Sequence, residues 1–193
     1  MMQLTMPKDI KSIVIASHNE GKVREIRSLL DPYGYKIISA KKLGINEPIE
    51  NGMTFSENSL IKSRNAAKKS GLVALADDSG LCVNSLNYRP GIHSARWAGK
   101  NKDFGMAMKK IQKLMEKNNL LSKYNRRAFF VCSLSVYFPD GKNKVFNGRV
   151  NGHLQFPPKG LNGFGYDPIF VAKGYRKTFG EMKLSNKYKI DHR

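Results

Sequence analysis

The sequence predicts an α/β protein with a mixed β-sheet, split into two lobes with a cleft between them. Three observations predict this class. A β-branched run, an amphipathic stretch and a second extended run follow one another near the start of the chain. Another helical stretch then leads into a short apolar run, and a long apolar strand later folds back as a hairpin. A chain of 193 residues is long enough to bury the core of one such domain.

The first elements are a strand, a loop, a helix and a second strand. Residues 13–15 are β-branched, and Val23, Ile26, Leu29 and Leu30 fall on one face of a helix. Pro and Gly within residues 31–34 end that helix, after which the chain becomes extended again. We therefore expect a βαβ unit at the start of the chain.

The middle of the chain predicts a capped helix and a short buried strand. Residues 54–70 have capping residues at their start, alanines inside and Gly71 just beyond their end. The apolar run at 72–76 is expected to end at Asp77 and Asp78, before a Ser-Gly turn. Both carboxylates would then emerge at the carboxyl edge of the sheet, where open α/β sheets bind ligands.

The later elements complete one domain that covers residues 1–193. Phe104, Met108, Ile111 and Met115 fall at helical spacing and are expected in the core. A strand at 128–138 turns through Pro-Asp-Gly-Lys into a partner at about 144–150. The remainder carries little regular pattern, so we expect loops and short elements folded over a site, with His93 and His153 in loops.

The charge balance points toward anionic ligands without choosing among them. The chain has 34 Lys and Arg against 15 Asp and Glu, a formal net charge of +19. Such an excess attracts nucleic acid, anionic membranes or polyphosphates. The lysines are scattered along the chain, so an ordinary basic, solvated surface explains more than half of the excess positive charge. A nucleic-acid-binding protein would show basic and aromatic side chains interleaved on a sheet face, whereas residues 128–138 predict a buried strand.

The cysteines and the N-terminal residues bear on the cellular compartment. Cys82 and Cys132 are far apart and form no metal-type pair, so neither a disulfide framework nor a zinc site is predicted. The N-terminal segment lacks the apolar core of a signal peptide, and no apolar run approaches the ~20 residues that cross a bilayer. We expect a soluble, cytoplasmic protein without a membrane partner.

The loop between the first strand and the first helix has the features of a phosphate-binding site. Free backbone N–H groups and the positive end of a helix favour phosphate, and a lysine in the first turn adds a full charge. It is not a Walker loop, because the first glycine and the final Ser or Thr are missing. The alternative is a well-capped helix, with Asn19 as its cap and Lys22 solvated. The candidate substrate-binding residues are Ser17, His18, Asn19, Glu20, Gly21 and Lys22.

Two adjacent carboxylates suggest a hard cation. Like charges so close together are costly unless a cation lies between them, and Mg²⁺ is usually bound by one or two carboxylates plus phosphate oxygens. Adjacent strand residues point to opposite faces, so only one of the pair need face the cleft. We favour Asp78 for function, while Asp77 is as readily explained by the turn. Glu50, or second to it Glu57, supplies another carboxylate.

A third candidate block contains glycines beside aromatic rings and an acid. Glycines permit close backbone approach, and rings offer a surface on which a nucleobase stacks. Phe164, Gly165, Tyr166 and Asp167 make up this block, whose alternative reading is an ordinary aromatic turn on the core. The basic end of the chain follows. Because untethered chain ends are mobile, we expect it to be loosely held without nucleotide.

Six segments taken together resemble the inosine triphosphate pyrophosphatase family, also described as dITP/XTP pyrophosphatases. They occur in register and cover essentially the whole chain: SHNEGKVREI, ENGMTFSENSLIKSRNAA, ALADDSGLCV, RPGIHSARWAG, GFGYDPIF and NKYKIDHR. The resemblance implies an elongated α/β fold with two lobes around a long mixed sheet and an active-site cleft. It also implies a homodimer and magnesium-dependent release of pyrophosphate from ITP, dITP and XTP.

The resemblance also implies residue roles. The loop at 17–22 would bind nucleotide, Glu50 would bind magnesium, and Asp78 would be both proton acceptor and second metal contact. The remaining substrate contacts would be Ser79, the block Phe164 to Asp167, Lys187, His192 and Arg193. The family usually has Ser where Asp191 stands, and usually continues beyond the His-Arg pair into a C-terminal helix.

The expected activity is therefore hydrolysis of deaminated purine nucleoside triphosphates to the monophosphate and pyrophosphate. Asp78 would activate a water that attacks the α-phosphorus, and donors from His192 or Arg193 would favour a 6-oxo purine over adenine. Two alternatives stay open. One is a pyrophosphatase for modified pyrimidine nucleotides, and the other is a basic nucleic-acid-binding protein.

Overall fold

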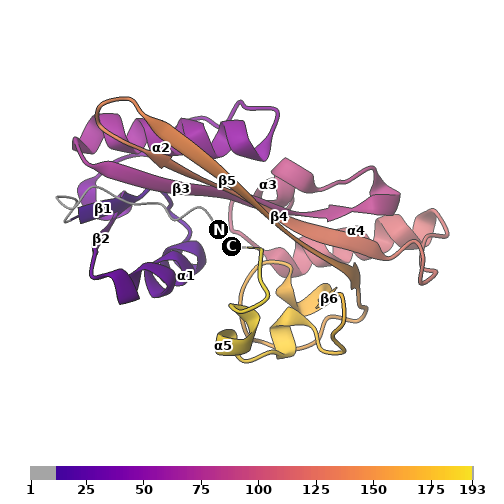
Figure 1. The fold of residues 1–193 in the computed structure, drawn as a ribbon. Coiled ribbons are helices and arrows are strands. Elements are labelled where there is room, and N and C mark those ends of the chain that lie inside the picture. The colour runs from indigo at the N-terminus through magenta and orange to yellow at the C-terminus, as the bar shows by residue number, and fades with distance from the viewer. Residues whose placement is uncertain (1–11, 193) are drawn as a thin grey trace. The chain divides into compact units, whose positions relative to one another are not determined.

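The computed structural model describes residues 12–192 and contains one six-stranded sheet in the order β2-β1-β3-β4-β5-β6 (Figure 1). The strands are β1 (Ser12–Ile15), β2 (Lys36–Ser39), β3 (Val73–Val83), β4 (Arg127–Tyr137), β5 (Asn143–Leu154) and β6 (Phe170–Ala172). The helices are α1 (Glu20–Leu30), α2 (Phe55–Ser70), α3 (Ser94–Trp97), α4 (Phe104–Lys117) and α5 (Leu184–Lys187). The mixed α/β class predicted from the sequence is confirmed. Within these residues no helix has the length and apolar character needed to span a membrane.

The chain divides into two compact units. The first unit comprises Met1–Asp77 and Ser133–Phe146, and the second comprises Asp78–Cys132 and Asn147–Arg193. Strands β3, β4 and β5 each contribute residues to both units. The boundary in β3 falls between Asp77 and Asp78, so the two carboxylates singled out by the sequence belong to different units.

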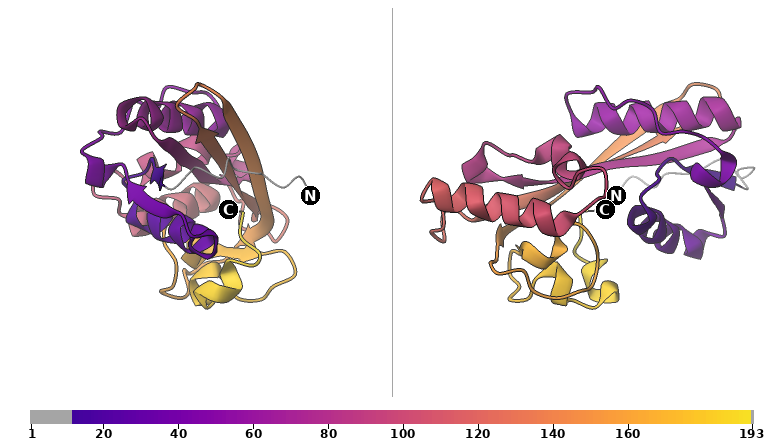
Figure 2. Two further views of the ribbon diagram at one scale, coloured as in Figure 1. Left: turned by 60° about the vertical axis from the view of Figure 1, so that its left-hand side comes forward. Right: turned by 180° about the vertical axis from the view of Figure 1, so that it is seen from behind.

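In the first unit, β1, β2 and β3 form a parallel part of the sheet, with α1 on one face and α2 on the other (Figure 2). β1 pairs in parallel with β2 and with β3, so the predicted βαβ start is confirmed. Alternate side chains of β1 point to opposite faces. Val14 packs in one apolar cluster with the alanines of α2, and Ile13 and Ile15 pack in another with Val23 and Ile26 of α1.

Local capping sets the ends of the helices. Thr54 and Glu57 form a capping box at the start of α2, and Gly71 ends it at a φ of 67°. Asn19 caps α1. Leu29 remains 41% exposed, so its predicted place on the buried face of α1 is wrong. The apolar stripe of α1 is narrower than the sequence pattern indicates.

The expectation that a strand ends at Asp77 and Asp78 is wrong. β3 runs without interruption from Val73 to Val83, through both carboxylates and the Ser-Gly pair that follows. It lies between β1 and β4 in the sheet. β1 pairs with residues Val73 to Leu75, before the carboxylates, and the strand continues beside β4 despite the low strand propensity of Asp and Gly, because strand preference depends strongly on context.

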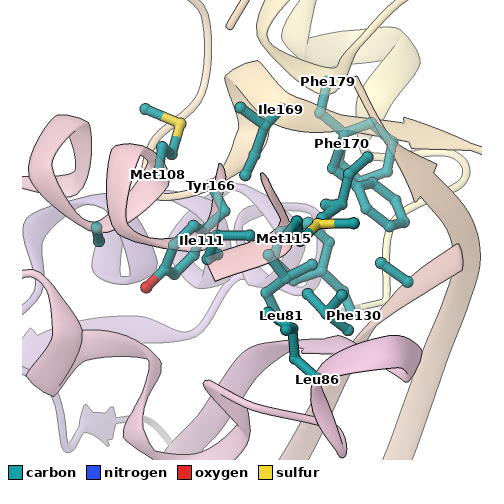
Figure 3. Close-up of a cluster of buried hydrophobic side chains, with 14 of the residues drawn as sticks. Leu81, Leu86, Met108, Ile111, Met115, Phe130, Tyr166, Ile169, Phe170 and Phe179 are labelled. Atoms are coloured by element: carbon teal, nitrogen blue, oxygen red, sulfur yellow. The ribbon is translucent and has the colours of Figure 1, made fainter. Parts of the chain in front are cut away.

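The core of the second unit is rich in aromatic side chains (Figure 3). Met108, Ile111 and Met115 of α4 lie in it, as the helical spacing predicted, together with Phe130 and Tyr166. The segment from 152 onward was expected to carry little regular structure, yet it contains β6, which pairs antiparallel with the end of β5. β5 is also longer than expected, so His153 lies in a strand and not in a loop.

Candidate functional site

The loop between β1 and α1 is fixed mainly by Asn19. Its Oδ1 accepts hydrogen bonds from the backbone N–H groups of Gly21 at 3.0 Å and Lys22 at 3.4 Å. The Ser17 hydroxyl in turn accepts from the Asn19 N–H at 3.1 Å. Asn19 is therefore the helix cap that the sequence offered as an alternative. Two amides of the first turn are already satisfied, so charge and not free N–H groups is the main attraction for an anion here.

The Lys22 side chain is held by Asp77. The distance from Lys22 Nζ to Asp77 Oδ1 is 2.8 Å, and the two side chains are 15% and 0% exposed. β1 and β3 are adjacent and parallel, with Ile15 opposite Leu75, which places Asp77 level with the start of the loop. The alternative of a solvated lysine is therefore wrong. An anion that reaches Lys22 must share it with Asp77.

His18 and Glu20 differ in their surroundings. The His18 N–H donates to Glu47 Oε1 at 2.9 Å, and its Nε2 lies 2.9 Å from the Ile45 carbonyl oxygen. Glu20 is exposed and lies 3.7 Å from Lys41, a loose surface pair. The sequence did not single out Glu47. An acid in a polar loop gave no local signal of this contact, which spans 29 residues.

The structure distinguishes the two candidates for the additional carboxylate. Glu57 Oε2 accepts from the N–H groups of Met53 at 2.6 Å and Thr54 at 3.1 Å, so this side chain is committed to the cap of α2. Glu50 pairs with Lys62 at 3.0 Å, and Lys62 is 7% exposed while Glu50 is 32% exposed. Glu57 is the more exposed of the two carboxylates, but it is engaged in the cap of α2, whereas the partly exposed Glu50 pairs with a lysine.

Asp78 begins the second unit and is 6% exposed. Because it follows Asp77 within a continuous strand, the two side chains point to opposite faces of the sheet. Ser79, the next residue, is partly exposed. The structure thus separates the adjacent carboxylates, of which Asp77 faces the loop lysine in the first unit.

The block from Phe164 to Asp167 is organised around a buried carboxylate. Asp167 Oδ2 accepts from the Phe164 N–H and from Lys187 Nζ, each at 2.9 Å. Gly163 has a φ of 74°, and a Cβ there would lie 2.0 Å from that oxygen, so only glycine fits. Burial raises the pKa of Asp167 from 3.8 to about 6, against the opposing effect of Lys187.

The two aromatic side chains of this block are used differently. Tyr166 is 2% exposed, its hydroxyl donates to the Ser94 carbonyl at 2.9 Å, and its ring meets Phe104 edge-on. Burial raises its pKa above the ordinary value. Tyr166 is thus packed in the core. Its neighbour Gly165 has a φ of 67°, a backbone conformation that favours glycine. The Phe164 ring is partly exposed and lies 5.2 Å from Lys187 Nζ.

The end of the chain packs onto the same region of the second unit. Lys187 is 1% exposed and contacts Asp191 at 3.3 Å in addition to Asp167. The His192 ring stacks on Phe130 with centroids 4.9 Å apart, and its Nδ1 contacts the Asp191 carboxylate. The expectation of a loosely held end is therefore wrong for His192, which is 7% exposed. Arg193 lies outside the described residues.

Asp191 is the residue of this region that the sequence did not assign. It contacts both Lys187 and His192, two of the predicted substrate-binding residues. The only sequence signal was that Asp stands where the family usually has Ser. A carboxylate against Nδ1 fixes a proton on that nitrogen and sets the orientation of the ring.

The fold is thus that of an α/β protein in which each unit holds a lysine against a buried carboxylate. Residues 13–193 match the Ham1 family, and the chain belongs to that family. The predicted resemblance to dITP/XTP pyrophosphatases is thereby confirmed.

Similar proteins and structures agree with this assignment. The chain is 53% identical over 182 residues to a dITP/XTP pyrophosphatase of Zymomonas mobilis, a match that covers 94% of this chain and 86% of that protein. The chain is also 50% identical over 181 residues to a dITP/XTP pyrophosphatase of Caulobacter vibrioides, and this match covers 94% of this chain and 91% of that protein. A HAM1 protein structure from Coxiella burnetii has a TM-score of 0.84 and 37% identity, and covers 94% and 92% of the two chains. The structure of the Staphylococcus aureus Ham1 protein has a TM-score of 0.79 and 42% identity, and the match covers 95% of this chain and 92% of that one.

Proposed function

We infer that this protein is a nucleoside-triphosphate pyrophosphatase that hydrolyses deaminated purine nucleotides, ITP, dITP and XTP, to the monophosphate and pyrophosphate. The observation that carries this inference is the match, over more than nine-tenths of the chain, to relatives described as dITP/XTP pyrophosphatases. Such an enzyme removes damaged nucleotides from the pool.

We propose that the loop at 17–22 in the first unit binds the triphosphate. Lys22 is the main cation there, and its pairing with Asp77 keeps it in place before substrate arrives. A preorganised charge stabilises developing negative charge without the cost of reorganisation. Asp77 in this proposal is a positioning residue and does not touch substrate.

We propose Mg²⁺ as the cofactor, held by Glu50 and Asp78. Among residues 12–192 there is no group of three or more His, Cys, Asp or Glu side chains that could hold a metal. The two proposed carboxylates are a donor set that suits a hard cation, which completes its shell with water and phosphate oxygens. Glu50 would be shared with Lys62. Bound magnesium supplies charge neutralisation on the phosphate oxygens.

Asp78 is proposed as the general base. Its carboxylate orients and deprotonates a water, which attacks the α-phosphorus, and pyrophosphate leaves. A positioned base contributes ~10²–10⁴-fold to the rate. The burial of Asp78, at 6% exposure, supports the proposal because a nearly dry carboxylate is held in one orientation.

Base selection is assigned to the second unit. Hypoxanthine and xanthine carry a 6-oxo acceptor where adenine carries an amino donor. Donors from His192 and Arg193 would form hydrogen bonds with the 6-oxo group. A substrate that leaves a buried polar group of the site unpaired is disfavoured ~10⁴–10⁵-fold in kcat/KM. The stacking of His192 on Phe130 and its contact with Asp191 support this role, because both limit the positions its ring can take. The Phe164 ring, beside Lys187, is the proposed stacking surface.

We further propose a cytoplasmic homodimer without a stable nucleic-acid or membrane partner. The family resemblance supports the dimer. The two cysteines are buried thiols that form no disulfide, which is consistent with a reducing compartment.

A pyrophosphate-release assay over ITP, XTP, dITP and the four standard nucleotides tests the function. We expect the three deaminated purines to have the highest kcat/KM. Preference for a modified pyrimidine triphosphate would instead favour the pyrimidine-directed alternative. Absence of magnesium-dependent hydrolysis with any nucleotide would contradict the proposed function itself.

A further inference from the structure

The second unit contains a basic cavity that the proposed reaction does not use. It has a volume of about 670 Å³ and is lined by residues of β4, β5 and the loops around them. Its basic members are Lys123, Arg127, Arg149, His153 and Lys173. The lining includes no Asp or Glu. The volume is typical of a pocket for a small ligand.

The basic side chains of this cavity are not neutralised. Within residues 12–192, none of the four lysine and arginine side chains pairs with a carboxylate. Like charges held together without a counter-ion repel one another, and an anionic ligand relieves that repulsion. The cavity therefore differs from the surroundings of Lys22, Lys62 and Lys187, each of which faces an acid.

Two guanidinium groups are held in place by contacts other than ion pairs. Arg149 Nε donates to Asn151 Oδ1 at 2.9 Å, and its guanidinium lies 3.5 Å from the centre of the Phe129 ring. Arg127 lies 4.2 Å from the centre of the Tyr124 ring. A guanidinium fixed in this way has less rotamer entropy to lose on binding, and its planar fork matches phosphate geometry. The cavity is therefore preorganised for an anion.

The cavity lies on the opposite face of β5 from His192. Gly148 of β5 is so close to His192 that an added Cβ would lie 2.0 Å from its carbonyl oxygen. Side chains alternate along a strand, so Arg149 and Asn151 point to the other face. On β4, Phe130 likewise faces His192, while its neighbour Phe129 lies under Arg149. A ligand in the cavity is thus separated by the sheet from the proposed base-binding residues.

Two neighbouring groups are consistent with a positive potential. The Nε of Arg126 is buried and has no hydrogen-bond partner among the described residues. The pKa of His153 is lowered by burial and, in smaller part, by the charges of Arg126 and Lys123. His153 is thus held toward its neutral form mainly by burial, with a smaller effect from the two cations.

We propose that this cavity is a second anion site that binds a di- or triphosphate group, either free or carried by a nucleotide. Four permanent cations match the three to four negative charges of such a group. The concave shape favours a compact anion over an extended strand. A second copy of this chain does not suit the cavity, because two such basic surfaces repel each other.

Isothermal titration calorimetry with inorganic tripolyphosphate tests the proposal, in EDTA and low salt. The protein carries Lys22→Ala, which weakens the other phosphate site, and is compared with and without Arg127→Ala plus Arg149→Ala. We expect the double substitution to weaken binding at least tenfold. Lys68→Ala plus Lys69→Ala, two exposed lysines of α2, removes equal charge elsewhere and should leave binding within twofold. Lys123→Gln plus Lys173→Gln repeats the test on exposed side chains if the arginine variant fails to fold.

The possible results distinguish a free polyphosphate from a nucleotide as the ligand, and they test the second anion site separately from the proposed reaction. Equal affinity for tripolyphosphate and ATP assigns the site to the phosphate group alone, and tighter ATP binding assigns it to a nucleotide. An unphosphorylated single-stranded oligonucleotide that binds more tightly than either would overturn the proposal, as would equal losses in the cavity and α2 variants. kcat/KM for ITP should stay within twofold in the Arg127→Ala plus Arg149→Ala protein, whether or not the proposed reaction is correct in detail.

Discussion

Each unit holds a lysine against buried carboxylate, but the two arrangements differ in balance and access. In the first unit Lys22 faces Asp77 one to one, and the lysine is 15% exposed. In the second unit Lys187 lies between Asp167 and Asp191, and no side chain of the three is more than 4% exposed. One arrangement leaves its cation within reach of a ligand, whereas the other is sealed.

The difference suggests distinct roles for similar chemistry. A partly accessible pair can exchange some of its interaction for a phosphate oxygen, so Lys22 suits substrate binding. A buried cluster of two acids and one lysine suits a structural role, because breaking it leaves an uncompensated buried charge and so destabilises the fold. The raised pKa of Asp167 reflects mainly its burial, to which the charge of Asp191 adds a smaller effect.

The largest effect is expected at the pair of adjacent aspartates. Asp78→Asn should keep the fold and lower kcat by at least ~10²-fold, because the amide keeps the shape but loses charge and basicity. Asp77→Asn should cost stability, since Lys22 loses its partner, and should retain more turnover. Steady-state kinetics and thermal melting of both variants measure this. An inactive, folded Asp77→Asn beside an active Asp78→Asn would reverse the two assignments.

Removing the central cation should damage the sealed cluster. Lys187→Met leaves two buried acids without a cation, and breaking a buried pair costs about 3–5 kcal/mol of unfolding free energy. Urea denaturation at pH 7 measures the loss. The matched control is Lys142→Met, because Lys142 pairs with Asp140 on the exposed hairpin and should matter little. Similar losses for both substitutions would refute the distinction between sealed and exposed pairs.

The same cluster should give stability a pH dependence. The pKa of Asp167 is about 6 in the folded protein and 3.8 ordinarily, so between those values the folded state keeps a proton that the unfolded state releases. Stability should therefore fall as the pH rises from about 4 to 6, by about 3 kcal/mol, and this contribution should be constant above that window.

Asp167→Asn isolates that dependence. The difference in unfolding free energy between the parent protein and this variant should change across the window and become flat above it. Asp140→Asn is the control of opposite sign, because the Lys142 side chain lowers the pKa of Asp140. If the difference in unfolding free energy between the parent protein and Asp167→Asn does not change with pH, the Asp167 carboxyl has the same protonation state in the folded and the unfolded protein across this window.

The smallest effect concerns the end of the chain. Removing residues 192 and 193 should reduce the preference for ITP over ATP by more than tenfold, because a charge-assisted contact is worth ~1.5–3 kcal/mol. The stacking of His192 on Phe130 means that some stability is lost as well. kcat/KM for both nucleotides decides the point. An unchanged ratio would move the discrimination to the block from Phe164 to Asp167.

The sequence predicted those elements whose determinants are local. Helical spacing and caps identify α2 and α4, and the β-branched run identifies β1. The continuity of β3 was missed because its neighbours in the sheet override the local preference of Asp-Asp-Ser-Gly. β6 was missed because a strand of 3 residues has no periodicity to detect.

The candidate site divides in the same way. Asn19 as a cap could be predicted from its place before a helix. The partners of Lys22, Glu50 and Lys187 could not, because each pairing depends on residues that only the folded chain brings together. Asp191 carried a signal only as a departure from the family pattern, and its contacts with Lys187 and His192 give that departure a physical meaning.

In the proposed reaction, water attacks the α-phosphorus of a deaminated purine triphosphate. Hydrolysis of ITP in ¹⁸O-labelled water, followed by phosphorus NMR or mass spectrometry of the products, identifies the phosphorus that is attacked. We expect the label in inosine monophosphate, with unlabelled pyrophosphate as the other primary product. Label in pyrophosphate, or orthophosphate as the primary product of a fresh reaction, would refute attack at the α-phosphorus.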